Sequence, residues 1–364
     1  MPSRFESEPP LSASTPLVSV VLAVRNEAQS IEEVLGSILD QDYPTDRLEI
    51  LVVDGESDDG SREIIRAFAE THPQVRLIDN PARIAPAAFN LGIVHARGDF
   101  LQILGAHTDY GSNYISACAR PLIDGTADVA GGLMITVARD DGAVARMIQL
   151  ALTHPFGVGQ NDIRVASGGS RYVDVLGYAM FKREVFEAIG LYDERLVRNQ
   201  DNEMYARVRN SGRRVYLTVE TQCRYRGQRR VRDLLRTTYG NGLYHMATLC
   251  VNPSSFRLRY FIPFFFVIAL LGSAVGSLFH WTGLPALGVL GGAYALAALL
   301  ATAHLIATRG WHGFMLAMPA LFGLIHVSYG WGTLIGIFRF VLSRRWLKQP
   351  ASSVTLAPRP TQSA

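Results

Sequence analysis

Short apolar runs alternate with polar turns and amphipathic helical stretches through the first half of the chain. Residues 18–24 and 50–53 are nearly continuous apolar runs of strand length, as in strands that are buried on both faces of a parallel sheet. A helical pattern over about 30–39 lies between them, which predicts a βαβ unit. The alternation continues with a strand over 75–79, a helix over 86–96 and strands over 100–104 and 128–135. The pattern predicts an α/β fold with a mostly parallel sheet covered on both faces.

The second half of the chain is apolar and almost uncharged. Only Arg309 carries a charge among the 79 residues between Arg259 and Arg339, where an average composition would supply about twenty charged residues. This region divides into the hydrophobic segments 260–279, 284–307 and 313–338. The first two are long enough to cross a hydrocarbon core of about 30 Å. We therefore predict C-terminal transmembrane helices, with a buried helical domain of a soluble protein as the alternative.

These patterns divide the chain into four parts. We expect a disordered lead over 1–16, an α/β domain over 17–245, a membrane domain over 246–342 and a basic, disordered tail over 343–364. The lead has neither a basic start nor an apolar core, so it is not expected to be a secretory signal. The three cysteines are widely spaced and form no CxxC pair, which favours a reducing compartment over a disulfide framework or a zinc site.

Positive charge gathers next to the first hydrophobic segment. Six arginines lie between positions 224 and 236, and Arg257 and Arg259 follow. The positive-inside rule then places the α/β domain in the cytoplasm. Three complete spans would put the basic tail on the other side, against the same rule, whereas a re-entrant third segment would return it. Both topologies remain open at this stage.

Two strand ends carry the chemistry and a family resemblance. The sequences LVSVVLAVRNE over 17–27 and VVDGESDDGS over 52–61 place carboxylates where ligands bind in open α/β sheets. Together with later motifs they resemble the family 2 glycosyltransferases over residues 17–245, most closely the succinoglycan-type exopolysaccharide glucosyltransferases. The resemblance implies a GT-A catalytic domain, which is Rossmann-like with a mostly parallel sheet, and a nucleotide-sugar donor.

The resemblance assigns the nucleotide to the first strand ends. Glu27 and Asp54 are expected to contact the uracil and the ribose, and Arg83, in the loop before the helix at Pro86, is expected to reach the base or the phosphates. The alternative for Asp54 is that it only caps the following helix.

The metal motif departs from the family pattern. Family members usually carry Asp-x-Asp or Asp-x-His after the strand over 100–104, and these residues hold Mg²⁺ or Mn²⁺ against the diphosphate. This chain reads Gly105-Ala-His107-Thr-Asp109, so the first aspartate is missing. We expect His107 and Asp109 as metal ligands. The alternatives are a metal held mainly by His107 and the diphosphate, or an inactive protein.

The acceptor side is predicted from two later segments. Asp201 precedes a helical stretch over 204–210 and resembles the family's catalytic base, with Glu203 as a supporting carboxylate. A helix N-terminus favours an ionised carboxylate, although Asp201 would also serve as a plain N-cap. Gly177 and Tyr178 lie in a stretch that resembles the family's acceptor-binding segment, or else forms an ordinary core strand.

The resemblance implies an inverting transferase of the bacterial inner membrane, multi-pass, with a cytoplasmic catalytic domain. It would move a hexose, glucose from UDP-glucose, onto a polyprenyl-diphosphate-linked saccharide in exopolysaccharide biosynthesis, in contact with membrane lipids. The alternatives are a polyprenyl-phosphate glycosyltransferase and, because of Gly105, an inactive membrane scaffold. A processive synthase is disfavoured because no Gln-x-x-Arg-Trp motif precedes the membrane region. No nucleic-acid partner is expected, since the arginines adjoin the membrane segment.

Overall fold

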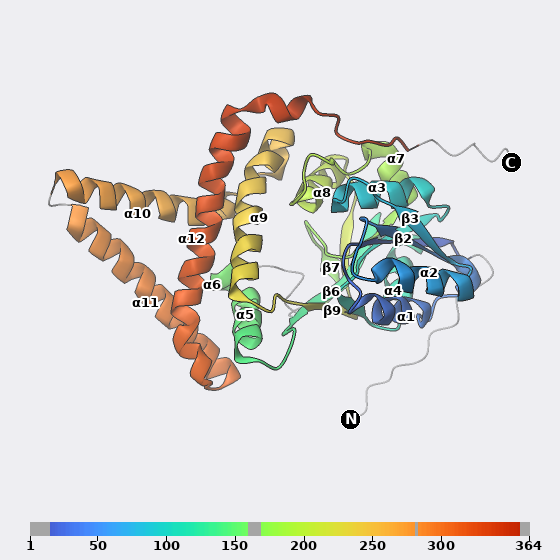
Figure 1. The fold of residues 1–364 in the computed structure, drawn as a ribbon, viewed down its shortest axis with the longest axis horizontal. Helices are drawn as coiled ribbons and strands as arrows, with labels where there is room; N and C mark the ends of the chain where they lie inside the picture. Colours follow the sequence, from blue (N-terminus) through green and yellow to red (C-terminus); the bar gives the residue numbers. More distant parts are fainter. Residues whose placement is uncertain (1–14, 159–168, 281–282, 357–364) are drawn as a thin grey trace.

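The computed structural model describes residues 15–158, 169–280 and 283–356. An α/β domain lies on one side and a group of long helices on the other, joined along the helix α9, Val231–Val251 (Figure 1). The expected disordered lead over 1–16 lies almost entirely outside the described residues.

A nine-stranded sheet forms the centre of the α/β domain, in the order β3-β2-β1-β4-β8-β6-β9-β5 with β7 beside β9. The strands are β1 Val18–Val24, β2 Leu48–Asp54, β3 Val75–Asp79, β4 Phe100–Gly105, β5 Thr108–Tyr110, β6 Val129–Val137, β7 Arg171–Tyr172, β8 Met180–Lys182 and β9 Val215–Arg226. The first four are parallel, as predicted. The other half is mixed, because β8 runs antiparallel to both β4 and β6. All seven residues of β2 are buried, which explains its continuous apolar run.

Helices cover both faces of this sheet. They are α1 Ile31–Leu39, α2 Ser61–Thr71, α3 Ala85–His95, α4 Tyr114–Ile123, α5 Ala143–Thr153, α6 Pro155–Val158, α7 Arg183–Ile189 and α8 Gln200–Asn210. Strand order reverses at β1, since β2 and β3 lie on one side of it and β4 on the other. Such a switch point opens a crevice at the carboxyl ends of the strands, and the site lies there.

Three stretches are long and apolar enough to cross a membrane: Leu258–Phe279, Gly283–Arg309 and Gly313–Leu342. They contain α10 Ile262–Phe279, α11 Gly283–Arg309 and α12 Met318–Gly336. Only 6% and 11% of the apolar windows of the first two are buried inside the protein, against 39% for the third. Figure 1 shows why: α10 and α11 project as a hairpin, whereas α12 runs alongside α9.

Glycines bring α9 and α12 into backbone contact. A Cβ atom at Gly242 of α9 would overlap the carbonyl oxygen of Tyr329, and one at Gly332 of α12 would overlap that of Tyr239. Small residues allow this close approach between helices in membranes. The contact between α9 and α12 therefore holds the apolar helices close to α9, which joins them to the α/β domain.

Replacing Gly242 by leucine is expected to force α9 and α12 apart and to lower the stability by about 1–3 kcal/mol, the usual cost of overpacking. Thermal unfolding of the detergent-solubilised protein measures this loss. Gly272→Leu in α10 is the matched control, because a Cβ there meets nothing within 4 Å. Equal unfolding temperatures for the two variants would contradict the close crossing.

The chain returns to the α/β domain after α12. The backbone N–H of Glu194 donates to the carbonyl oxygen of Ala351 at 2.6 Å. The Ser352 hydroxyl donates to the Glu194 carboxylate at 3.1 Å and accepts from the Asn90 amide at 3.2 Å. Leu356 packs on the main core. The part of the expected disordered tail up to residue 356 thus makes defined contacts with the α/β domain, because Asn90 and Glu194 supply polar partners that its composition does not reveal.

Candidate active site

One continuous cavity of about 1170 Å³ connects the two parts of the protein. Its polar end is formed by the tips of β1 and β4, and α8 and α9 contribute its middle. Its far end reaches α10 at Phe266 and α11 at Tyr294. The cavity therefore joins the crevice of an α/β sheet to helices that are apolar enough for a bilayer.

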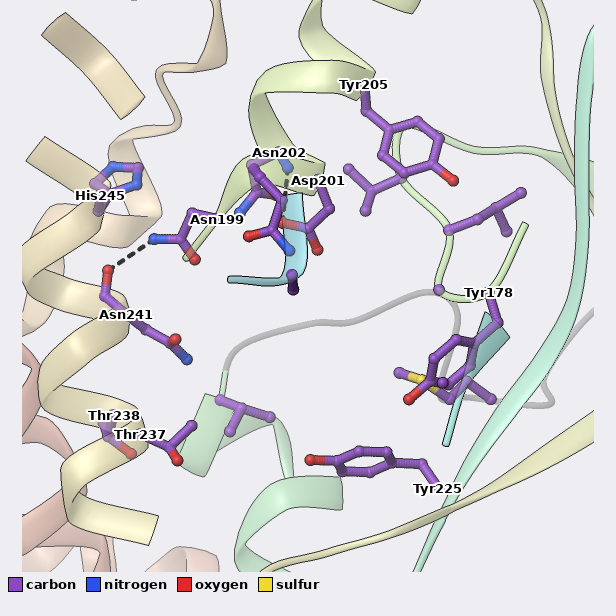
Figure 2. Close-up of a pocket in the computed structure, with 18 of the residues that line it drawn as sticks. Tyr178, Asn199, Asp201, Asn202, Tyr205, Tyr225, Thr237, Thr238, Asn241 and His245 are labelled. Carbon is purple, nitrogen blue, oxygen red and sulfur yellow. Dashed lines mark hydrogen bonds between the residues drawn. The ribbon is translucent and has the colours of Figure 1, made fainter. Parts of the chain in front are cut away.

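Asp201 faces this cavity near the start of α8 (Figure 2). The helix is preceded by Asn199, which has a left-handed backbone (φ 58°) and whose side-chain amide donates to the carbonyl oxygen of Asn241 in α9 at 2.8 Å. Asp201 lies within the helix, so it is not the N-cap residue. One carboxylate oxygen accepts the N–H of Asn202 at 2.8 Å. Desolvation of the carboxylate by the surrounding protein raises the pKa of Asp201, and the hydrogen bond from Asn202 opposes this rise.

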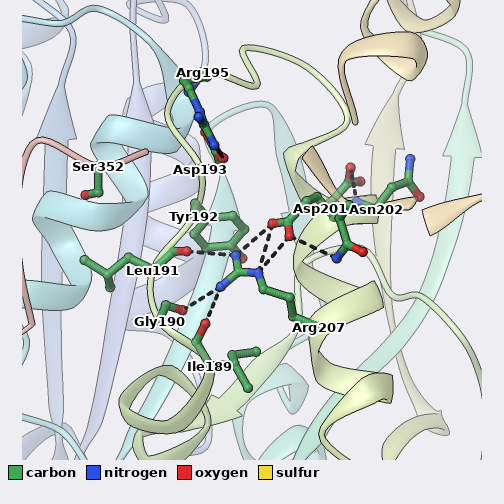
Figure 3. A network of polar contacts seen from close by, with 12 residues as sticks. Ile189, Gly190, Leu191, Tyr192, Asp193, Arg195, Asp201, Asn202, Arg207 and Ser352 are labelled. Carbon is green, nitrogen blue, oxygen red and sulfur yellow. Dashed lines mark hydrogen bonds and ion pairs between the residues drawn. The ribbon is translucent and has the colours of Figure 1, made fainter. Parts of the chain in front are cut away.

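Glu203 points away from the cavity. It is 3% exposed and pairs with Arg207 at 2.8 Å. Arg207 also donates to the carbonyl oxygens of Ile189 at 2.5 Å and Leu191 at 2.8 Å, as Figure 3 shows. Glu203, predicted on the acceptor side as a supporting carboxylate, does not line the cavity. This carboxylate fixes α8 to the preceding loop and so positions Asp201.

The tips of β1 and β4 bring together part of the predicted nucleotide site. Glu27, Arg83 and His107 all line the cavity, and Nδ1 of His107 lies 3.6 Å from the Glu27 carboxylate. Arg25 joins them, since its guanidinium donates to the carbonyl oxygen of Arg83 at 3.3 Å. Arg83 pairs with Glu56. The sequence prediction did not include Arg25, although its place at the end of β1 was a signal for it.

Asp54 lies behind the cavity wall. It is completely buried, and its carboxylate accepts from the Ser57 hydroxyl at 2.5 Å and from Arg62 at 2.6 Å. Its neighbour Gly55 lines the cavity instead. In the structure Asp54 therefore braces the loop after β2; it does not cap α2, whose N-cap is Gly60 without a side-chain hydrogen bond.

Asp109 lies in β5 and, unlike His107, does not line the cavity. Thr108 and Tyr110 are buried, so Asp109 between them points to the other face, where it pairs with Arg226 at 2.8 Å. Within the described residues, no three His, Cys, Asp or Glu side chains converge as metal ligands. The expected pair of ligands, His107 and Asp109, does not fit a divalent cation, because only His107 lines the cavity and Asp109 is paired with Arg226.

A tyrosine fills the place of the missing metal-binding aspartate. A Cβ on Gly105 would lie 2.6 Å from the ring of Tyr178, whose backbone has a positive φ of 53°. Its carbonyl oxygen accepts from Gln102 at 2.8 Å and from the Tyr114 hydroxyl at 2.9 Å. Tyr178 and Gly177 both line the cavity, as an acceptor-binding role requires. The segment is a loop rather than a core strand.

Introducing aspartate at position 105 is expected to destabilise the protein by about 1–3 kcal/mol through overlap with Tyr178, without creating a cation site. Thermal unfolding with and without Mn²⁺ measures both effects. Tyr178→Ala should relieve the loss in the double variant, and Gly36→Asp is the control, because nothing lies within 4 Å of its Cβ. Stabilisation of Gly105→Asp by Mn²⁺ would contradict this expectation.

The mixed sheet and the crevice at its switch point, with Asp201 at the start of α8 facing it, are the arrangement of the GT-A fold. Residues 19–190 match the family model Glycosyl transferase family 2. These residues thus form a family 2 glycosyltransferase domain.

Two curated relatives extend the likeness into the helical part. The succinoglycan biosynthesis protein ExoA of Rhizobium meliloti is 27% identical over 74% of this chain and 81% of its own length. The dolichyl N-acetyl-alpha-D-glucosaminyl phosphate 3-beta-D-2,3-diacetamido-2,3-dideoxy-beta-D-glucuronosyltransferase of Methanococcus voltae is 25% identical over 88% of this chain and 97% of its own. Among solved structures, the mannosyltransferase PcManGT of Pyrobaculum calidifontis, in complex with GDP-Man and Mn²⁺, covers 88% of each chain with a TM-score of 0.55. At 23% identity this last likeness concerns the fold alone.

Proposed function

We propose that this enzyme is an inverting hexosyltransferase that builds a polysaccharide or a lipid-linked glycan at a membrane. The observation that carries the proposal is the single cavity between the strand tips and the apolar helices, with Asp201 facing its middle. The two relatives named above support it, since one takes part in succinoglycan biosynthesis and the other acts on a dolichyl phosphate-linked sugar. We propose UDP-glucose as donor and a polyprenyl-diphosphate-linked saccharide as acceptor.

In the proposed reaction, Asp201 acts as general base. It takes the proton of an acceptor hydroxyl while that oxygen bonds to the anomeric carbon of the donor. The bond from the anomeric carbon to the diphosphate breaks in the same step, so the electron pair leaves with UDP and the configuration inverts. A base positioned for this transfer contributes a factor of about 10²–10⁴ to the rate.

The diphosphate faces positive charge in this proposal. Arg25, Arg83 and His107 surround the strand tips where it would lie, and Glu27 is placed beside His107 to contact the nucleotide. Guanidinium groups bind phosphate oxygens through paired hydrogen bonds. These side chains stabilise the leaving UDP in place of the metal ion that the missing aspartate would help to hold.

The presence of a general base favours a hydroxyl as the nucleophile. A phosphate monoester loses its second proton near pH 6, so a polyprenyl phosphate would attack without help from a base. A sugar hydroxyl needs the proton to be removed. This chemistry favours a lipid-linked saccharide over the polyprenyl-phosphate alternative.

We also propose that the protein resides in the bacterial inner membrane, with the catalytic domain on the cytoplasmic side. The arginines between positions 224 and 236 and at 257 and 259 support this orientation.

UDP release by the purified, detergent-solubilised protein tests the function. The assay uses UDP-glucose, a bacterial lipid extract as acceptor source, and either Mg²⁺, Mn²⁺ or EDTA. We expect acceptor-dependent release that persists in EDTA, because the guanidinium groups of Arg25 and Arg83 lie at the proposed diphosphate position. Release that requires Mn²⁺ would contradict the expected activity without a metal and would make His107 and Glu27 candidate ligands. Absence of turnover with every nucleotide sugar would favour the alternative of an inactive membrane scaffold.

The acidic limb of the pH–rate profile should report Asp201. A base works only when ionised, so the rate rises as the pH passes upward through its pKa and falls below it. Because the protein around Asp201 raises this pKa, the limb should lie above the ordinary aspartate value of about 3.9. Acceptor-dependent UDP release across a pH series measures it. A limb that persists in Asp201→Asn would assign it to another group.

A further inference from the structure

Three arginines gather where the cavity approaches the membrane helices. Arg209 lies on α8, Arg257 and Arg259 lie between α9 and α10, and all three line the cavity. Arg257 pairs with Asp174 at 2.5 Å, and Arg209 donates to the carbonyl oxygen of Asp174 at 2.7 Å. The Asp174 carboxylate thus pairs with Arg257, while the Arg209 guanidinium binds a backbone carbonyl oxygen, so these three side chains together carry a net positive charge.

Burial and a neighbouring like charge both act on Arg209 of this arginine cluster. Burial lowers the pKa of Arg209, and the neighbouring Arg257 adds to this effect, whereas Asp174 opposes it. Like charges held together at a partly buried site are costly unless an anion neutralises them. The cluster is therefore suited to an anionic ligand.

His245 gives a second and independent sign of a ligand. It lines the same cavity and is only 2% exposed, yet its Nε2 has no hydrogen-bond partner among the described residues. Its ring packs edge-on against Tyr260 at 4.8 Å, and the guanidinium of Arg259 lies over the same Tyr260 ring at 5.4 Å. An unpaired buried polar atom costs about 1–3 kcal/mol, a cost that a bound ligand removes.

An apolar arm of the cavity begins beside the cluster. It is lined by Pro263 and Phe266 of α10, Tyr294 of α11, and Ile325 and Tyr329 of α12. The Phe266 and Tyr294 rings stack at 4.5 Å. All five residues belong to the stretches that are apolar enough to cross a membrane, so the arm suits a hydrocarbon chain.

We propose that Arg209, Arg257, Arg259 and His245 bind the phosphate or diphosphate that joins the acceptor saccharide to its lipid, and that the apolar arm takes the first part of the lipid chain. The inference rests on the proposed function and adds a subsite to it. Arg209 follows Asp201 by eight residues of one helix, which corresponds to about 12 Å along its axis. The phosphate is therefore held away from the base, and the saccharide occupies the space between them.

Binding of farnesyl diphosphate to the full-length protein in detergent tests this subsite. It combines an isoprenoid chain with a diphosphate, while farnesol supplies the chain alone and inorganic pyrophosphate the anion alone. We expect farnesyl diphosphate to bind more tightly than either and together with UDP. In the double variant Arg209→Gln/Arg257→Gln its dissociation constant should rise about tenfold or more, whereas Arg257→Lys should retain part of the affinity.

UDP binding shows that each variant is folded and reports the donor site separately. Arg232→Gln is the matched control, because Arg232 is exposed and does not line the cavity. Unchanged affinity in the double variant, an equal loss in Arg232→Gln, or displacement of farnesyl diphosphate by UDP would each overturn the subsite. Failure of the wild-type protein to bind UDP would instead contradict the proposed function.

Discussion

Asp201→Asn is expected to lower acceptor-dependent UDP release by about 10²–10⁴-fold, the contribution of a positioned base. Asparagine has the shape of aspartate but cannot accept the hydroxyl proton. Its side-chain oxygen still accepts the N–H of Asn202, which bonds Asp201 at 2.8 Å in the structure. The affinity for UDP should therefore stay close to that of the wild type, because the strand-tip residues remain unchanged.

The control for this prediction is Asp46→Asn, because the Asp46 side chain is 79% exposed and paired only at the surface. It removes the same charge without touching the cavity. Retained transfer by Asp201→Asn would show that another group removes the proton, and parallel loss of UDP binding would point to a folding defect.

Glu203→Gln is expected to reduce stability by about 3–5 kcal/mol, the usual effect of removing one partner of a buried ion pair. The Glu203 side chain is 3% exposed and that of Arg207 is 23% exposed. Arg207 would keep its bonds to the loop carbonyls but lose its counter-charge. Denaturant unfolding measures the change, and turnover at low temperature should fall less than in Asp201→Asn.

Glu63→Gln serves as the comparison for Glu203→Gln. Its ion pair with Arg66 is also on one helix, but the Glu63 side chain is 70% exposed, so its loss should cost less than about 1 kcal/mol. Similar effects for both variants would show that the Arg207 network does not hold the start of α8.

The first four strands could be predicted because their apolar runs and polar ends are local features of the sequence. The same local signals placed Glu27, His107 and Asp201 at the cavity. Asp54 and Asp109 were predicted from the same kind of pattern, but their direction depends on the pleat and on partners elsewhere. Asp109, for example, pairs with Arg226, 117 positions later.

The acceptor side was less accessible to sequence reasoning. His245 is one histidine on a helix, and only the packing of α9 beside α8 and α10 makes it a cavity residue. Gly105 suggested a loss of function from the sequence, yet the ring of Tyr178 occupies the space that an aspartate side chain at position 105 would need. Neither relation has a fixed spacing that a motif could express.

The contacts of Ala351 and Ser352 with the catalytic domain impose a parity condition on the path of the chain. If α10 and α11 cross a bilayer, a chain that leaves this domain before α10 and is bound to it again after α12 must cross that bilayer an even number of times. The projecting hairpin of α10 and α11 would then supply two crossings, and α12, packed along α9 (Figure 1), would lie at the surface of the membrane. The basic residues Arg344, Arg345 and Lys348 would lie on the same side as the catalytic domain, which is the side that the positive-inside rule favours for them.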